Sequence, residues 1–311
     1  MAAYPITWPT PCGGAWVPHR VTSAELFVSP QPHLTPLIVA AVIGAGALHA
    51  CWNAITKQVP DRLMAFAWIG AASAVIGGLV LGLTGLPDRE AIGFAIASAV
   101  IHVGYDLALM NSYRLGAFNQ TYPIARGTSP LVVAVGAYFL AGEHLSAAAL
   151  TGIATLAAGL MSLALSSGRL TRHDAPAVGA AIVTGLTIAA YTIVDGIGVR
   201  HAGNPWAYTA LLFALQGPPL TIAAAVRRPA AAWRDRATVE RGLLAGILCV
   251  VAYGVVLWAQ TSAPLAEVAA IRETSVVFGA FIGLVALGED FGRRRVAAAV
   301  VIATGIILIS L

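Results

Sequence analysis

The sequence has little charge and little cysteine. Charged residues make up 10% of its 311 residues, whereas hydrophobic residues make up 58%. Soluble domains carry about 25% charged residues, so the composition excludes an ordinary soluble protein. Cys12, Cys51 and Cys249 show no paired spacing, which argues against a disulfide framework or a zinc site. The net charge of +4 arises largely from arginines in short gaps between apolar runs, so it does not predict nucleic-acid binding.

The sequence also lacks catalytic signatures. It contains no His-Glu-x-x-His, no Gly-x-Ser-x-Gly, no Walker-type loop and no cluster of cysteine and histidine with metal-ligand spacing. It therefore predicts a protein that is not an enzyme and needs no cofactor or metal. Residues 1–34 contain six prolines and no apolar signal segment. We interpret them as a disordered leader or as the product of a start codon assigned too far upstream.

Long apolar runs alternate with short polar breaks over the rest of the chain. About 20 apolar residues cross a bilayer as a helix, and membrane β-barrels show shorter alternating segments instead. We therefore expect an all-α integral membrane protein with ten transmembrane helices. The predicted spans are 37–56, 63–83, 91–113, 121–140, 147–165, 177–199, 206–226, 242–261, 267–288 and 296–311.

One motif recurs in the second half of the chain without a gap. Arg126 returns as Arg272, 146 positions later, and the same shift carries Thr128 onto Thr274 and Glu143 onto Glu289. We predict two five-helix repeats, residues 35–168 and 175–311. Because each has an odd number of spans, the second repeat enters the membrane from the opposite side, which places a site near the midplane.

The breaks between spans differ in basic residues. The odd-numbered breaks hold thirteen and the even-numbered breaks two. The positive-inside rule places the odd breaks in the cytoplasm and both termini outside. Glu143 and Glu289 end the fourth and ninth spans, where we expect them to order loops.

Polar side chains recur within the spans at spacings that share one helical face. Each ionisable one costs on the order of 2.5–3.5 kcal/mol on insertion scales, so it faces a wet cavity or bonds a neighbouring helix. We expect a cavity lined by spans one, three, four, six, eight and nine. The candidate substrate-binding residues are Arg126, Arg272, Asn53, Trp52, Tyr122, Tyr191, Asn119 and Thr274; the candidates for proton coupling or charge pairing are Asp106, Asp195, Glu273, His49 and His102.

The two intramembrane arginines each lie about six residues into a span. This depth predicts guanidinium groups that bracket the midplane about 12 Å apart along the membrane normal. Each must meet an acid, a backbone carbonyl or a bound anion. If Glu273, Asp106 and Asp195 neutralise both, the arginines are structural. If at least one faces the cavity, its planar fork suits a carboxylate, phosphonate or phosphate of the substrate.

The duplicated arginine span, the five-plus-five plan and the Gly-Glu span endings resemble the EamA-type branch of the drug/metabolite transporter superfamily. Residues 49–53, His-Ala-Cys-Trp-Asn, and residues 122–130, Tyr-Pro-Ile-Ala-Arg-Gly-Thr-Ser-Pro, are similar to a branch associated with phosphonate utilisation. The resemblance implies secondary transport, often export, of a small metabolite without ATP hydrolysis.

We expect the substrate to be anionic or zwitterionic, and the other partner to be the lipid bilayer. Seventeen arginines against one lysine are typical of a GC-rich bacterial genome, which favours the bacterial plasma membrane. A lipid-intermediate flippase, an intramembrane enzyme, and a non-transporting sensor or assembly protein stay open as alternatives.

Overall fold

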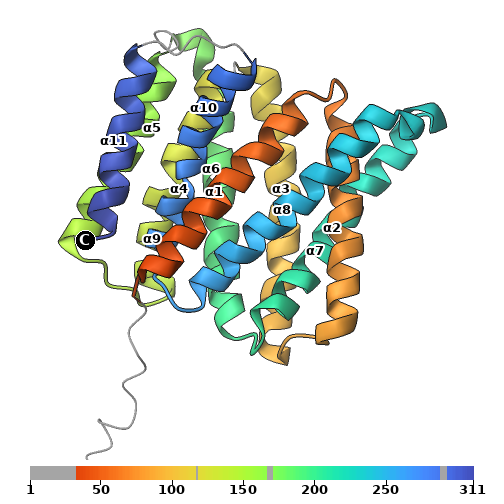
Figure 1. Cartoon of the computed structure of the whole chain (residues 1–311), viewed down its shortest axis with the longest axis horizontal. Helices are drawn as coiled ribbons and strands as arrows, with labels where there is room; N and C mark the ends of the chain where they lie inside the picture. Colours follow the sequence, from red (N-terminus) through yellow and green to blue (C-terminus); the bar gives the residue numbers. More distant parts are fainter. Residues whose placement is uncertain (1–32, 117, 167–170, 288–292) are drawn as a thin grey trace, which may run out of the picture. The chain divides into compact units, whose positions relative to one another are not determined.

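The structure is a computed structural model that describes residues 33–116, 118–166, 171–287 and 293–311. Within these ranges the secondary structure is helical and contains no strand, which confirms the predicted all-α fold there. The helices belong to one compact unit, residues 32–311, and the predicted leader lies almost wholly outside the described residues. The helices, shown in Figure 1, are α1 Pro36–Lys57, α2 Arg62–Thr84, α3 Arg89–Leu115, α4 Phe118–Leu140, α5 Ala147–Ser166, α6 Ala175–Arg200, α7 Pro205–Arg227, α8 Arg236–Gln260, α9 Leu265–Arg272, α10 Thr274–Leu287 and α11 Arg293–Ile309, with short 3₁₀ turns η1 Arg172–Asp174 and η2 Ala230–Arg234.

Polar residues in the breaks set where several helices begin. Thr35, Asp61, Asn204 and Asp235 precede α1, α2, α7 and α8, and each accepts a hydrogen bond from a first-turn backbone N–H through its side-chain oxygen. Such caps satisfy donors that the helix itself leaves unpaired. The polar residues that mark the breaks in the sequence are therefore the residues that cap these helices.

Eight helices in the described part of the chain, α1 to α8, are long and apolar enough to cross a membrane. The other two predicted spans correspond to α9 with α10 and to α11, which has 17 residues. The prediction of one continuous ninth helix is wrong. The helix is interrupted at Glu273, where Glu273 N–H donates to Ala270 O and Val276 N–H donates to Glu273 O, both at 3.0 Å. These shorter i→i−3 bonds tighten the backbone at a buried polar sequence. The total of ten spans stays a prediction.

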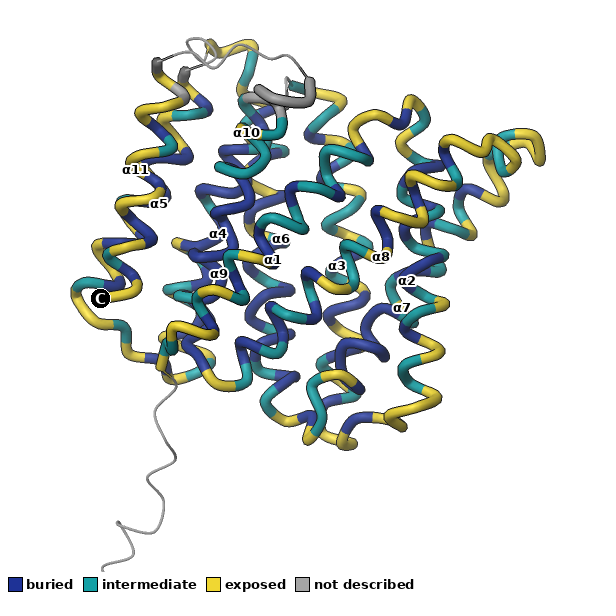
Figure 2. The backbone as a smooth tube through the Cα atoms, in the orientation of Figure 1, coloured by how far each residue is buried: buried dark blue, intermediate teal, exposed yellow. Residues whose placement is uncertain are grey.

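Large apolar side chains cover the outside of the bundle. Leu79, Phe139 and Val226 are exposed to 67%, 75% and 81%, and Figure 2 shows buried residues concentrated on the inward helix faces. Soluble monomers rarely expose apolar patches of such extent. The surface is therefore one that faces lipid, with the polar residues held inside the bundle.

The helices of the two predicted repeats pair in a reciprocal way. Helix α1 packs on α8 as α6 packs on α3, α1 packs on α10 as α6 packs on α4, and α2 meets α7 while α5 meets α11. Where α2 crosses α7, a Cβ added to Gly70 would meet the Gly217 carbonyl, and a Cβ added to Gly217 would meet the Gly70 carbonyl. A two-fold axis that exchanges the halves gives this pattern, so it supports the predicted repeat. The boundaries 35–168 and 175–311 stay predictions.

Candidate functional site

A cavity of about 90 Å³ lies inside the bundle. It holds several water molecules or one small ligand, and is smaller than the several hundred Å³ of drug-sized sites. In the described part of the chain seven helices line it, namely α1, α2, α3, α6, α7, α8 and α9. The lining residues are His49, Trp52, Phe66, Ile69, Gly70, Ser73, His102, Tyr105, Asp106, Tyr191, Phe213, Gln216, Gly217, Leu220, Cys249, Tyr253 and Arg272.

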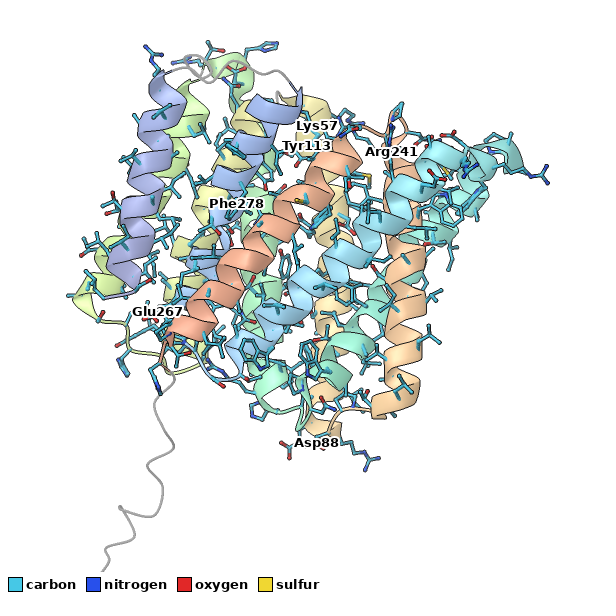
Figure 3. All side chains as sticks on the ribbon, viewed as in Figure 1. Lys57, Asp88, Tyr113, Arg241, Glu267 and Phe278 are labelled. Carbon is cyan, nitrogen blue, oxygen red and sulfur yellow. The ribbon has the colours of Figure 1, made fainter. Side chains whose placement is uncertain are left out.

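The cavity lies between the middle of the bundle and one of its ends. Figure 3 shows Lys57, Tyr113 and Arg241 at that end and Asp88 and Glu267 at the other. The lining residues of α2 come from its first half, which begins at the Lys57 end, and α7 contributes residues from its middle onward, toward the same end. This end carries the arginine-rich breaks.

Arg126 is enclosed by protein and does not line the cavity. Its Nη1 donates to Glu273 Oε1 at 3.0 Å, and the two side chains are 3% and 0% exposed. Its Nη2 contacts His49 Nε2, and its guanidinium lies 5.3 Å from the centre of the Tyr122 ring. A carboxylate, an imidazole and an aromatic ring therefore surround this arginine. Tyr122 packs against Arg126 and, among the described residues, is not part of the cavity wall.

Arg272 lines the cavity and lacks such enclosure. Its Nε is 3.9 Å from Glu273 Oε1, and its guanidinium lies 6.0 Å from the centre of the Tyr191 ring. Among the described residues its Nε and Nη2 atoms have no hydrogen-bond partner, although the side chain is only 3% exposed. Both arginines approach the same carboxylate oxygen, so they lie much closer together than the predicted separation of about 12 Å.

The charges around Glu273 do not balance. One carboxylate serves two guanidinium groups, and in the described part of the chain neither Arg126 nor Arg272 has a second acidic partner within 4.0 Å. Arginine keeps its proton in such surroundings. The cluster of Arg126, Arg272 and Glu273 therefore holds one excess positive charge beside the cavity, at Arg272.

His49 and Trp52 form the cavity wall on α1. Trp52 Nε1 lies 3.2 Å from His49 Nδ1, and the two rings meet edge to face at 5.0 Å. Because His49 also contacts Arg126, it separates that arginine from the cavity. Asn53 bonds its own helix instead, since its Nδ2 donates to His49 O at 2.8 Å, and it is absent from the cavity lining among the described residues.

Aromatic rings make up much of the opposite wall. The His102 ring stacks on Tyr191 with centroids 4.0 Å apart, and His102 Nδ1 is 3.0 Å from Ser98 O. Tyr105 meets Tyr191 edge to face at 5.5 Å. The backbone of its own helix thus orients His102, and its ring stacks on Tyr191, the tyrosine whose ring lies near Arg272.

The two aspartates differ from the expectation that they could neutralise an arginine. Asp195 is fully buried and accepts hydrogen bonds from the Tyr208 hydroxyl at 2.9 Å and the Tyr253 hydroxyl at 2.5 Å. Asp106 lines the cavity. Neither forms an ion pair in the described ranges, so the alternative in which these aspartates neutralise the arginines is not found there. Asp195 is held by the two tyrosine hydroxyls, whereas Asp106 faces the cavity.

Two other predicted binding residues are Thr274 and Asn119. Thr274 is not among the residues that line the cavity in the described part of the chain. Thr274 begins α10, and its buried Oγ1 has no hydrogen-bond partner among the described residues; Gly46 of α1 lets that helix approach Thr274 closely. The side chain of Asn119 lies outside what the structure describes.

A polar cluster occupies the opposite end of the bundle. The Glu143 carboxylate accepts from the Leu265 N–H at 3.0 and 2.8 Å and from Arg200 Nη2 at 2.7 Å. Arg200 also donates to Gln260 O at 2.8 Å and Ala263 O at 2.9 Å. Glu143 thus caps α9 and orders the loop before it, as expected of a loop-ordering acid. Glu289 lies outside the described residues.

Sequence reasoning missed the contribution of spans two and seven, and it wrongly placed span four in the cavity lining. Phe66 and Ser73 of α2 and Phe213 and Gln216 of α7 line the cavity, whereas among the described residues α4 does not. Gln216, an amide in the middle of an apolar span, was the available signal. Tyr105 and Tyr253 carried no such signal, because aromatic residues are common in membrane interiors.

Comparison with known proteins agrees with this architecture. The model of the EamA-like transporter family matches residues 175–311, and no curated protein sequence matches the chain. A crystal structure of another protein superposes with a TM-score of 0.71 over 88% of this chain and 98% of its own, at 15% identity, which shows a shared fold. The resemblance drawn from the arginine repeat is confirmed over residues 175–311, and the eight long apolar helices of the described residues are those of a multi-pass membrane protein.

Proposed function

We propose that this protein is a secondary active transporter of the bacterial plasma membrane that moves a small polar metabolite bearing an acidic group. The observation that carries the proposal is Arg272, a buried guanidinium that lines the cavity with two nitrogen atoms unpartnered among the described residues. A cation held in a low-dielectric bundle without full pairing has a high free energy. An incoming carboxylate, phosphonate or phosphate offers the bidentate acceptor that it lacks.

The reciprocal packing of the two halves supports alternating access. In this structure the cavity lies toward the arginine-rich end, and the Glu143 cluster joins the loop between α4 and α5 to the end of α6 and the start of α9 at the other end. If the positive-inside rule holds, the arginine-rich end is cytoplasmic. Exchange of the two halves about their two-fold axis then moves the opening of the site to the other side of the membrane.

Binding to the purified full-length chain tests the site. Thermal unfolding is measured against carboxylates, organic phosphates, phosphonates and amino acids, because a ligand of the native state raises the unfolding temperature by mass action. Stabilisation by acid-bearing compounds is expected to disappear in Arg272→Gln. It should weaken in Arg272→Lys, which keeps the charge and loses the planar fork.

Flux assays in proteoliposomes then test transport of the compounds that bind. Gradient-driven movement is expected with the unaltered protein and is lost with Arg272→Gln. The proposal is overturned if Arg272→Gln retains binding and flux, or if every compound that binds is a cation without an acidic group.

A further inference from the structure

The connection between α7 and α8 carries a dense group of arginines. Residues 227–241 contain five arginines and two acids, and both acids are engaged within the protein. Asp235 caps α8 by accepting from the Thr238 N–H at 3.3 Å, and Glu240 accepts from Arg236 Nε at 2.7 Å. The connection therefore keeps a net positive charge that its own acids do not balance.

Two of the five arginines hold the connection against the loop between α1 and α2. Arg228 Nε donates to Asp61 Oδ2 at 2.5 Å, and Arg241 Nη1 donates to Gln58 O at 3.3 Å. These contacts reach both ends of the connection, because Arg228 follows α7 directly and Arg241 lies in the second turn of α8. They fix its position on the bundle.

Arg227 and Arg234 are exposed on the surface of the connection. Among the described residues neither forms a hydrogen bond or an ion pair. Figure 2 shows the connection as largely exposed, at the end of the bundle where Figure 3 labels Arg241. A guanidinium group presents a planar fork of donors that matches the oxygen atoms of a phosphate. These two side chains are therefore available to an anionic partner.

Two tryptophans indicate the depth of this surface in the membrane. Trp233 of η2 meets Trp68 of α2 with ring centroids 5.4 Å apart, and both pack against a small apolar cluster of Met64, Ala67 and Ala224. Tryptophan is enriched where the hydrocarbon of a membrane meets the headgroups. The tryptophan pair therefore places the arginines of the connection at the level of the headgroups.

An exposed apolar stripe on α7 leads up to these arginines. Leu215, Ile222 and Val226 are exposed to 38%, 61% and 81%, and their spacings of seven and four residues place them on one helical face. At 1.5 Å per residue the stripe is about 16 Å long, close to the ~15 Å of hydrocarbon in one leaflet. The stripe has the length of an acyl chain and ends beside Arg227.

We infer that this surface binds an anionic phospholipid, with its phosphate against Arg227 and Arg234 and an acyl chain along the α7 stripe. Arginine clusters beside a membrane helix attract lipids that carry net negative charge. A soluble anion would use the arginines and leave the stripe uncovered, and an apolar partner would cover the stripe and leave the arginines unpaired. An anionic lipid satisfies both features.

Quenching in proteoliposomes measures this binding in the full-length chain. Cys12, Cys51 and Cys249 are replaced by serine, and a bimane fluorophore is attached at Ala230→Cys, at the start of η2. Phosphatidylglycerol and phosphatidylcholine, each with a nitroxide near the top of the acyl chain, are compared in vesicles of unlabelled phosphatidylcholine. Labelled phosphatidylglycerol is expected to reach half-maximal quenching at a mole fraction about tenfold lower.

Matched double variants test the two arginines. Arg227→Gln combined with Arg234→Gln should bring the two half-maximal mole fractions close together. Arg89→Gln combined with Arg172→Gln removes two exposed arginines elsewhere and should keep the preference for phosphatidylglycerol. In pure phosphatidylcholine both double variants should unfold at the temperature of the unaltered protein, because all four side chains are exposed. This comparison separates lost lipid binding from lost folding.

Soluble glycerol phosphate tests whether the ligand is a lipid. It carries the phosphate without acyl chains, so millimolar concentrations should leave the quenching by labelled phosphatidylglycerol unchanged. Displacement by glycerol phosphate would overturn the lipid assignment. Equal quenching by the two lipids in the unaltered protein would also overturn the inference, as would a preference that survives in the Arg227 and Arg234 double variant or disappears in both double variants.

Discussion

Arg126 and Arg272 occupy matching positions in the two halves of the chain but have opposite surroundings. Arg126 is enclosed by Glu273, His49 and the Tyr122 ring. Arg272 lines the cavity and shares the same carboxylate at the longer distance of 3.9 Å. The residue after each arginine explains the difference, because Gly127 stands in the first half where Glu273 stands in the second.

This single difference shows how a repeated scaffold produces one binding site. Gly127 packs closely against α5, where a Cβ would meet Leu160 and Met161 at 3.2 and 3.3 Å, so a larger side chain there would press against α5. Glu273 reaches across to the arginine of the other half. The repeat therefore supplies two buried cations and one anion, and the unbalanced cation lies at the cavity.

Removing the carboxylate that the two arginines share should have the largest effect on stability. Glu273→Gln leaves two buried guanidinium groups without an acid, and breaking a buried ion pair in this way costs about 3 kcal/mol or more. Thermal unfolding and size-exclusion profiles in detergent measure the loss. Glu267→Gln is the matched control, because Glu267 lies on α9, the helix that ends at Glu273, and forms no ion pair in the described ranges. Similar unfolding temperatures for the two variants would contradict the assigned role of Glu273.

Gly70 and Gly217 differ from the two arginines, because their surroundings are alike in the two halves. Each glycine meets the other's carbonyl where α2 crosses α7, so valine at either position should cost a similar amount, about 1–3 kcal/mol from overpacking. Gly78→Val is the control, since a Cβ at Gly78 of α2 meets no atom within 4 Å. Unfolding temperatures that fall for one crossing glycine and not for the other would argue against the reciprocal contact.

Asp61 and Arg228 form a smaller contact between the halves. The Arg228 side-chain hydrogen bond is the main cause that lowers the pKa of Asp61 below its ordinary value of 3.8. A lowered folded-state pKa stabilises the protein above the unfolded pKa, and this contribution disappears as the pH falls through the folded pKa. Both side chains are 37% exposed, so the effect should stay below about 1 kcal/mol.

The pH dependence of unfolding checks this contact. The difference in unfolding temperature between the unaltered protein and Asp61→Asn should be present at pH 6 and should shrink as the pH falls below 3.8. Arg228→Gln removes the same ion pair from the other side and should show the same narrowing. A difference that stays constant over this range would show that the ion pair does not contribute.

Much of the fold was predictable because membrane spans are encoded locally. Apolar runs and polar breaks predicted helices α1 to α8, and the breaks supply caps such as Asp61 and Asn204. The interruption at Glu273 was not predicted, because no proline or glycine lies between Ala269 and Ser275. The break instead accompanies the ion pair of Glu273 with Arg126, 147 positions away in sequence.

The candidate site was predictable in its residue types but not in its arrangement. Polar stripes identified Arg272, Asp106, His49 and His102, all of which line the cavity. Sequence alone could not decide which arginine Glu273 would neutralise, because that choice depends on how α4 and α9 pack. For the same reason it could not show that Asp195 would bond two tyrosines instead of an arginine.

The unfolding temperatures of Arg126→Gln and Arg272→Gln, measured without ligand, test whether the excess buried charge lies at Arg272. Arg126→Gln removes the closer partner of buried Glu273, so it should destabilise the protein. Arg272→Gln removes the excess buried charge, so it should leave the unfolding temperature unchanged or raise it, because an unpaired buried charge is unfavourable. Equal destabilisation by the two substitutions would contradict this assignment of the excess charge, since Arg272 would then be as fully paired as Arg126.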